Sequence, residues 1–294
     1  MKGKQISIII FIALALIWGS AFLCIKKGLI FFTPIEVACI RILIGGIVLL
    51  PFTLTHATRV RKQDWKYIVF AGFQGSLIPA LCFAIAQQHI DSSVAGVLSS
   101  MTPVFTVLIS VFIFKERYKL INYIGMIIGL LAAIGLIMYK SGGEFSIGVY
   151  GLLIVLAAML YASNLNLFKY KLSHVPSMTI ASCALILAAP VSAIILVYFG
   201  TFSRMGQPSA IEPLLYLLVL GVFATGAALI LFNIMLKYAS PMFAGSITYV
   251  IPLVSTFIGI LDGEMTNQWT WILTLVLLLS LYLVSKKRTI PVET

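Results

Sequence analysis

The sequence has few charged residues, and acidic residues are especially scarce. Only 10% of the 294 residues are charged, and Asp and Glu together number nine. A soluble domain has about 25% charged residues, so this chain cannot cover itself with a water-facing surface. Hydrophobic residues make up 61%, and the mean hydropathy is +1.09. These values exclude an ordinary soluble globular protein, a coiled coil and a disordered chain, and they indicate a surface that faces lipid.

The sequence also lacks the residue patterns of enzymes, metal sites and ATP hydrolysis. HExxH, GxSxG and Walker A sequences are absent. The three histidines fall in predicted connections, far apart in sequence: His56, His89 and His174. The four cysteines lie inside apolar runs, which is typical of small buried hydrophobic residues: Cys24, Cys39, Cys82 and Cys183. We therefore expect no catalysis, no metal and no cofactor.

The apolar runs predict ten membrane-spanning helices joined by short connections, because about 20 apolar residues cross a bilayer. The first run follows Lys2 and Lys4 but continues past Trp18 without a small-residue cleavage pattern, so we interpret it as an uncleaved span. The predicted spans cover about residues 6–25, 35–54, 68–88, 94–114, 121–139, 148–168, 177–199, 214–236, 242–261 and 268–285.

Lys and Arg are concentrated in alternate connections. With a cytoplasmic N-terminus, fifteen of them fall inside and four outside, while Arg41 lies within a span. Basic residues mark cytoplasmic loops. We therefore predict a multi-pass protein of the cell (cytoplasmic) membrane, bacterial in type, with both termini cytoplasmic. The net charge of +11 then reflects orientation. The predicted partners are the lipid bilayer and a small-molecule substrate, without nucleic acid, and the chain acts as a monomer or homodimer.

The two halves of the chain repeat each other. Residues 72–114 align with 221–263 at an offset of 149, and both segments contain Ala-Gly, then Pro seven residues later, then an acidic residue near the span end. The first spans of the halves match at an offset of 143. Each half holds five spans, so the second half enters the membrane in the opposite direction. The prediction is an all-α integral membrane protein with ten transmembrane helices in two inverted five-helix repeats, residues 1–140 and 145–288. Such repeats are typical of secondary transporters.

Several short motifs resemble those of a known family. Trp18-Gly19-Ser20 followed by Lys26, Pro34 and Arg41 resembles the start of the drug/metabolite transporter superfamily, in its EamA-like branch. Pro103 with Glu116, and Pro252 with Glu264, resemble the ends of its two repeats. The resemblance covers nearly the whole chain. It implies ten helices, cytoplasmic termini, alternating access around a central cavity, and export or exchange of small metabolites, commonly amino acids or related compounds.

Arg41 is the strongest single candidate for substrate binding, because it is the only strongly charged residue well inside a predicted span. Its planar guanidinium suits a substrate carboxylate. It could instead brace helix ends by bonding backbone carbonyls. The family resemblance favours bracing, because the family places an Arg here across many substrate classes, and both interpretations stay open. The second half has no base that matches Arg41, and it has Tyr161 where the first half has Trp18. A pseudo-symmetric site would therefore be chemically lopsided.

Trp18 and Tyr161 are equivalent through the repeat and are expected to face each other at a cavity, with ordinary helix packing as the alternative. Aromatic faces suit an amphipathic or aromatic ligand and can also hold a cation. Other polar residues within spans are candidates for substrate contact, or for hydrogen bonds between helices: Gln74, Ser99, Asn164, Thr248 and Tyr249.

Four residues are candidates for hinges or gates. Pro103 and Pro252 each remove a backbone hydrogen bond and can bend the fourth and ninth spans, although Pro can also simply allow close packing. Glu116 and Glu264 lie at span ends, where we expect tertiary locks or gate elements rather than proton carriers.

These observations predict a secondary transporter that exports or exchanges small metabolites such as amino acids or related compounds. No Asp, Glu or His lies in the middle of a predicted span, and Glu36 lies only at a span's edge. We therefore hypothesise a facilitator or exchanger driven by substrate gradients. The alternatives are a proton-coupled antiporter of drugs or amphipathic amines and, less favoured, a channel, for which the sequence shows no filter.

Overall fold

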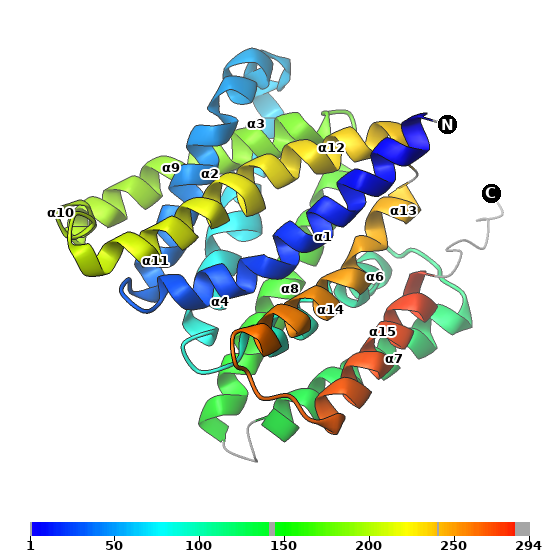
Figure 1. Ribbon diagram of the computed structural model, residues 1–294. Helices are drawn as coiled ribbons and strands as arrows, with labels where there is room; N and C mark the ends of the chain where they lie inside the picture. Colours follow the sequence, from blue (N-terminus) through cyan, green and yellow to red (C-terminus); the bar gives the residue numbers. More distant parts are fainter. Residues whose placement is uncertain (1, 141–144, 240, 286–294) are drawn as a thin grey trace.

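The computed structural model describes residues 2–140, 145–239 and 241–285, and this part of the chain is helical without strands. A lipid-facing chain must satisfy its backbone internally, which these apolar runs achieve as helices. The spans of the first half are α1 (Lys2–Gly28), α2 (Pro34–His56), α3 (Trp65–Gly72) with η3 (Phe73–Leu77) and α4 (Ile78–Ala86), α5 (Ser92–Ser99) with α6 (Thr102–Phe112), and α7 (Leu120–Lys140) (Figure 1).

The second half has the same series of elements. Its spans are α8 (Phe145–Lys171), α9 (Ser177–Tyr198), α11 (Pro208–Val219) with η4 (Leu220–Ala227) and α12 (Ala228–Tyr238), α13 (Pro241–Gly245) with α14 (Ile247–Leu261), and α15 (Gln268–Ser285). Short connecting helices are η1 (Ala57–Arg59), η2 (Lys62–Asp64) and α10 (Thr201–Arg204). Within the described residues, nine segments are long and apolar enough to cross a membrane, and Gln268–Val284 is a shorter apolar helix. The prediction of an all-α, multi-span fold is confirmed.

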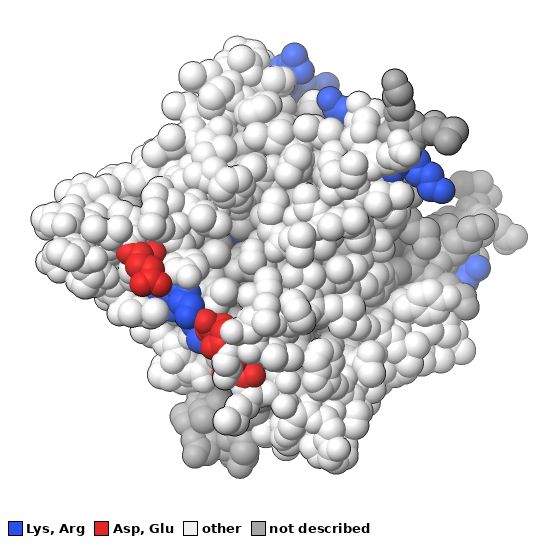
Figure 2. Space-filling model, in the orientation of Figure 1, with Lys and Arg blue, Asp and Glu red and all other residues white. Residues whose placement is uncertain are grey.

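The outer surface is apolar, as a bilayer environment requires. Large hydrophobic side chains point outward from many helices, among them Ile9, Leu54, Leu131 and Leu275. Figure 2 shows that acidic and basic atoms gather near the ends of the helices on this face, while a broad band between them is uncharged. Charged side chains therefore lie where water and lipid headgroups can solvate them.

The two halves interlock through equivalent helix pairs. The second span of each half packs on its counterpart, α2 against α9, and the fifth spans pair in the same way, α7 against α15. The first span α1 packs against α12 and α14 of the other half, and its counterpart α8 packs against α4 and α6. Exchanging the halves reproduces these contacts, which is the packing expected of two related repeats. The repeat boundaries at 140 and 145 stay a prediction.

The third and eighth spans each contain a widened turn that the sequence alone did not predict. The N–H of Ile78 donates to the carbonyl of Phe73, and the N–H of Ala228 donates to the carbonyl of Phe223, five residues back in each case. The two turns, η3 and η4, occupy equivalent positions in the repeat. Widened turns of this kind often occur at functional sites, where they redirect the residues that follow.

The fourth and ninth spans are interrupted, but at positions that do not match through the repeat. The fourth span breaks at residues 100–101, and Pro103 lies in the first turn of α6. The ninth span breaks at Ser246, whereas Pro252 lies inside the continuous helix α14. The interruption of the ninth span is therefore not at Pro252. A proline removes one backbone hydrogen bond, and packing on both sides can keep the helix continuous around it.

Glycines at helix contacts set how closely the helices approach, and Gly72 gives a test of this packing. A Cβ on Gly72 would clash with the carbonyl oxygen of Ala184 in α9, and a backbone atom cannot move aside as a side chain can. We expect Gly72→Ala to destabilise the protein by about 1–3 kcal/mol. The measurement is the thermal unfolding of the detergent-purified protein.

The matched control is Gly206→Ala, because a Cβ at Gly206 meets nothing within 4 Å. Its unfolding temperature should equal that of the parent. A Gly72→Ala protein as stable as the Gly206→Ala protein would contradict the close approach of α3 and α9.

Candidate functional site

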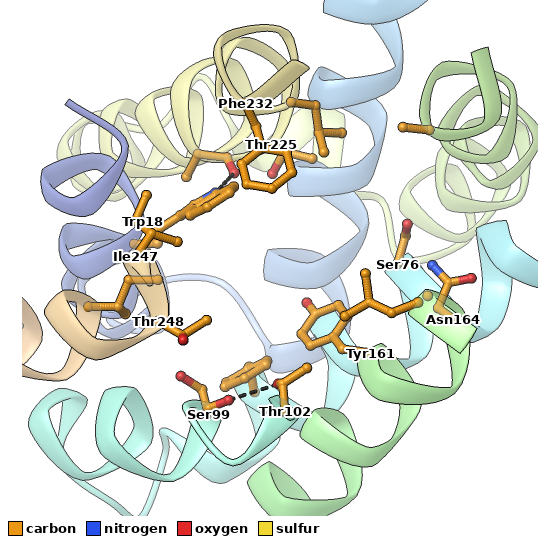
Figure 3. A pocket seen from close by; sticks show the side chains of 18 of the residues that line it. Trp18, Ser76, Ser99, Thr102, Tyr161, Asn164, Thr225, Phe232, Ile247 and Thr248 are labelled. Atoms are coloured by element: carbon orange, nitrogen blue, oxygen red, sulfur yellow. Dashed lines mark hydrogen bonds between the residues drawn. The ribbon is translucent and has the colours of Figure 1, made fainter. Parts of the chain in front are cut away.

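A cavity of about 470 Å³ lies between the two halves. Its wall is formed by both halves and includes residues of α1, α2, η3, α5, α8, α9, η4, α12, α13 and α14. Figure 3 shows the side chains of the wall converging on this space. Six of the eight residues predicted for substrate binding line the cavity: Trp18, Arg41, Ser99, Tyr161, Asn164 and Thr248.

The other two predicted residues, Gln74 and Tyr249, are not part of the cavity wall. Gln74 belongs to η3, but the neighbouring residues Gly75 and Ser76 line the cavity instead. The hydroxyl of Tyr249 donates to the carbonyl of Leu281 at 2.6 Å and so ties α14 to α15. For Tyr249 the structure therefore favours the helix-to-helix hydrogen bond that the sequence left open.

Trp18 and Tyr161 lie on opposite sides of the cavity, from α1 and α8 (Figure 3). The indole Nε1 of Trp18 donates to the carbonyl of Ala224 in η4 at 3.1 Å. This bond satisfies the one polar atom of the indole, so the rest of the ring can face an apolar ligand group. The ring centroid of Trp18 lies 5.8 Å from that of Phe232, and Tyr161 stacks on Phe83 at 6.2 Å.

Among the described residues that line the cavity, Arg41 alone is charged. Its Nε donates to the hydroxyl of Thr225 at 3.0 Å, and that hydroxyl donates to the carbonyl of Leu220 at 3.2 Å. Within the described part of the chain, no carboxylate lies at ion-pair distance from Arg41. The guanidinium also acts electrostatically on Tyr161. The geometry thus fixes the side chain through Nε and leaves its positive charge uncompensated at the cavity wall.

Hydroxyl and amide groups complete the polar part of the wall. Ser99 donates to the carbonyl of Gly96 at 2.8 Å, and Thr248 donates to the carbonyl of Gly245 at 2.9 Å, so each hydroxyl keeps acceptor capacity. Asn164 lies beside the widened turn η3, where its amide packs against Gly75. Figure 3 places Asn164 next to Ser76 and Ser99 near Thr248.

Sequence reasoning missed Thr225 and Ser76, which both line the cavity. The signal that could have found them is the repeat, because Ser76 and Thr225 align at the offset of 149 and both are hydroxyl residues in an apolar run. It also missed a set of apolar and small polar residues of the wall: Phe22, Phe83, Ser100, Thr102, Phe168 and Phe232. Phenylalanine is so common in this chain that no pattern distinguishes these positions.

A scan against family models decides which family these features belong to. The EamA-like transporter family matches residues 5–138 and again residues 149–286, so nearly the whole chain is covered by two copies. The chain belongs to the EamA-like transporter family. The predicted family resemblance is therefore confirmed, and the protein is a multi-pass membrane transporter.

Relatives of this EamA-like transporter have the same general description. It is 27% identical over 285 residues to the uncharacterized inner membrane transporter YedA of Escherichia coli strain K12, covering 93% of this chain and 88% of YedA. It is 26% identical over 273 residues to an uncharacterized transporter of Archaeoglobus fulgidus, covering 92% and 95%. A solved crystal structure matches with a TM-score of 0.63 at 19% identity, covering 94% and 95%, which shows a shared fold alone.

Glu264 of the EamA-like transporter lies in an ion cluster at the end of α1 and α14. Lys26 Nζ lies 2.8 Å from Asp262 and 3.0 Å from Glu264. Glu264 also accepts hydrogen bonds from the backbone N–H groups of Ser92 and Ser93, at 2.9 and 3.0 Å. Burial alone would raise the pKa of Glu264, but the N–H of Ser93 and the Lys26 ammonium outweigh it and hold the pKa below its ordinary value.

Glu116 forms the counterpart at the opposite end of the bundle. Its carboxylate lies 2.5 Å from Lys169 Nζ and accepts a hydrogen bond from the hydroxyl of Tyr118 at 2.7 Å. Burial raises the pKa of Glu116, whereas Lys169 and the tyrosine hydroxyls lower it, and the net pKa is about 2. Both glutamates are therefore charged at neutral pH and are held by ion pairs and hydrogen bonds. Their role as locks or gates stays a prediction.

The carboxylate of Glu36 is also held by hydrogen bonds and an ion pair, at the start of α2. It accepts hydrogen bonds from the N–H and hydroxyl of Thr33, which caps the helix, and from the hydroxyl of Thr201 at 2.6 Å. It also forms an ion pair with Arg204. Glu36 therefore anchors α2 to α10. Within the described residues, no cluster of three or more metal-ligating side chains occurs.

The lowered pKa of Glu116 has a consequence for the pH dependence of stability. A carboxyl whose pKa falls on folding stabilises the folded state above its unfolded pKa, and this stabilisation is lost as the pH falls. The stability difference between the parent and Glu116→Gln should be constant from pH 7 to 5. It should then decrease between the ordinary pKa of 4.5 and about 2. The measurement is thermal unfolding of both proteins across this pH series.

Lys169→Met provides the control for the partner. In that variant Glu116 has lost its counter-ion, so its folded-state pKa should rise from about 2 toward 4.5. The pH dependence attributable to Glu116 should therefore be smaller than in the parent and should end at a higher pH. An unchanged pH dependence in Lys169→Met would show that the pair does not set the pKa.

Proposed function

We propose that this protein is a secondary transporter that exports or exchanges small metabolites, such as amino acids or related compounds, by alternating access. The observation that carries the proposal is the cavity between the two halves, with the uncompensated guanidinium of Arg41 in its wall. Its size falls in the range of small-molecule sites, about 300–1,000 Å³. A single charge in an otherwise uncharged wall favours a ligand with a complementary charge.

The wall supports a substrate with an anionic group and an apolar or aromatic part. A carboxylate would accept hydrogen bonds from the terminal nitrogens of Arg41, which Thr225 holds in place through Nε. The apolar part would contact the aromatic rings that flank the cavity, Trp18 with Phe232 and Tyr161 with Phe83. Amphipathic amines fit less well, because none of the described residues that line the cavity carries a carboxylate.

The arrangement of acids favours transport driven by substrate gradients over proton antiport. Within the described wall, the cavity has no Asp, Glu or His to carry a proton. Glu36 is held by Arg204 and Thr201, away from that wall. A channel is also disfavoured, because the ion pairs of Lys26 with Asp262 and Glu264, together with the bond from Ser92 to Glu264, join α1, α5 and the end of α14 across one end of the bundle.

The experiment is exchange in proteoliposomes, with substrates first selected by thermal shift. Candidate amino acids, amines and carboxylates are screened on the purified protein, since a ligand of the folded state raises its unfolding temperature. Uptake of the labelled compound should saturate and should increase when the unlabelled compound is present inside. Uptake that never saturates would instead indicate a channel, and uptake driven by an imposed pH gradient and lost in Glu36→Gln would indicate proton antiport.

Arg41 is expected to determine the charge preference. A hydrogen bond to a charged group contributes about 1.5–3 kcal/mol, so Arg41→Gln should weaken carboxylate binding by roughly ten- to a hundredfold. Binding of the matching amide should change little. Arg41→Lys should be intermediate, because a lysine keeps the charge without the planar fork. Equal losses for the carboxylate and the amide would indicate that Arg41 only braces the helices.

Trp18 and Tyr161 are expected to matter for transport rather than for folding. Trp18→Ala and Tyr161→Ala should each lower the transport rate without lowering the amount of folded protein, because each removes an aromatic wall of the cavity. The matched control is Trp269→Ala, since Trp269 is exposed and does not line the cavity. Parent-like transport in both cavity variants would contradict the assignment of the site.

A further inference from the structure

Two ion pairs occupy equivalent positions at opposite ends of the bundle. Lys26 near the end of α1 matches Lys169 near the end of α8 at the repeat offset of 143. Glu264 follows the ninth span and pairs with Lys26, and Glu116 follows the fourth span and pairs with Lys169. We call the first the Lys26 cluster, which also contains Lys27 and Asp262, and the second the Lys169 pair.

The Lys26 cluster is larger and more buried than the Lys169 pair. Lys27 lies 2.5 Å from Asp262, which extends the cluster to two lysines and two acids. The side chain of Glu264 is only 2% exposed, whereas Glu116 is 32% exposed and Lys169 is 51% exposed. In Figure 2, basic and acidic atoms alternate along the edge of the surface near the end of α1. A buried, multiply bonded pair is costly to break from one side, whereas an exposed pair contributes little.

The Lys26 cluster also joins three spans where the Lys169 pair joins two. Glu264 holds the first two N–H groups of α5 in addition to Lys26 of α1. In the repeat, the position equivalent to Ser92 is Pro241, at the start of α13. Proline has no backbone N–H, so the second half cannot reproduce that contact.

The cavity wall is more buried toward the Lys26 cluster than toward the Lys169 pair. Wall residues near the cluster are buried, namely Ala21, Phe22, Ile25 and Phe83. The rings of Phe22 and Phe83 are tilted by 58° with centroids 5.7 Å apart, and the Gln87 amide donates to the carbonyl of Phe22 at 2.8 Å. At the other end, Phe168, Ala181 and Phe232 are partly exposed and Gly245 is exposed.

We propose that the Lys26 cluster is a gate that keeps its end of the cavity closed, and that it makes the conformation open at the Lys169 end the resting state of the empty protein. The Lys169 pair is formed in this same conformation, so it does not act as an equivalent gate at the open end. This inference builds on the alternating access proposed above. Opening the Lys26 end must separate Glu264 from Lys26 and from the start of α5, whereas closing the Lys169 end leaves the exposed pair in water. Lys26, Asp262 and Glu264 thus set the balance between the two conformations.

The test is the accessibility of a cysteine placed in the cavity wall. Ser99→Cys is labelled in oriented membrane vesicles with a membrane-impermeant thiol reagent added from one side at a time. Gly206→Cys and Lys62→Cys, both exposed, mark the sides of the Lys26 cluster and of the Lys169 pair. The four native cysteines are buried, so the parent protein gives the background. Ser99→Cys should react faster from the Lys62 side.

Gate variants are then added to Ser99→Cys. Glu264→Gln and Lys26→Met should raise the labelling rate from the Gly206 side by about tenfold or more. Glu264→Gln removes the charge that holds Lys26 and the N–H groups of Ser92 and Ser93, and Lys26→Met removes the counter-ion of the buried Glu264. The matched variants Glu116→Gln and Lys169→Met should change that rate by less than about twofold. Equal effects of the variants in the two pairs would overturn the proposal. So would faster labelling of Ser99→Cys, without a gate variant, from the Gly206 side.

A milder variant and a readout without substrate complete the labelling test. Asp262→Asn is a milder change at the more accessible acid of the cluster, and it should raise the labelling rate from the Gly206 side by an intermediate amount. This variant serves as the test if Glu264→Gln or Lys26→Met yields no folded protein. Absence of any rise in folded Asp262→Asn would count against the proposal. Labelling requires no substrate, so its result stands whether or not the exchange experiments identify a transported compound.

Discussion

The cost of placing a charge in hydrocarbon shapes this protein more than any other interaction. A bilayer offers no water to solvate an ionic group, so charges lie at the membrane boundary, pair with each other, or face a cavity. Arg41 belongs to the last group, held by Thr225 beside the central space. Glu36, Glu116, Glu264 and their basic partners belong to the second. The scarcity of charge thus separates the charged residue of the cavity wall from those that hold the helices together.

The spans, the repeat and several of the residues that line the cavity could be predicted, because each leaves a recognisable pattern in the sequence itself. Apolar length gives the spans, and a charge or an aromatic residue far from a span end singles out Arg41 and Trp18. The partner of Arg41 was not predictable, because Thr225 lies 184 residues away and hydroxyl residues are common. Gln74 and Tyr249 were assigned to the cavity because helices that are apolar all round give no indication of which face is inward.

The two halves share a fold but differ chemically. Tyr161 stands where the first half has Trp18, and the second half has no base that matches Arg41. Equivalent backbones keep the cavity central, while unequal side chains give it one charged side. The ends of the bundle follow the same rule, since the lysine and glutamate recur but their surroundings do not. A duplicated scaffold can therefore bind an asymmetric ligand in a single orientation.

The widened turns η3 and η4 have a consequence for helical register. An α-helix advances by about 100° per residue, so one extra residue in a turn rotates everything beyond it by that angle relative to what came before. In η3 this rotation accompanies Gly75 and Ser76 at the cavity wall, and in η4 it accompanies Ala224 and Thr225. In the third and eighth spans, the side chains before the widened turn and those after it can therefore face directions that are set independently. Each half-helix can keep its own contacts with neighbouring spans, while the junction turns its own residues toward the cavity.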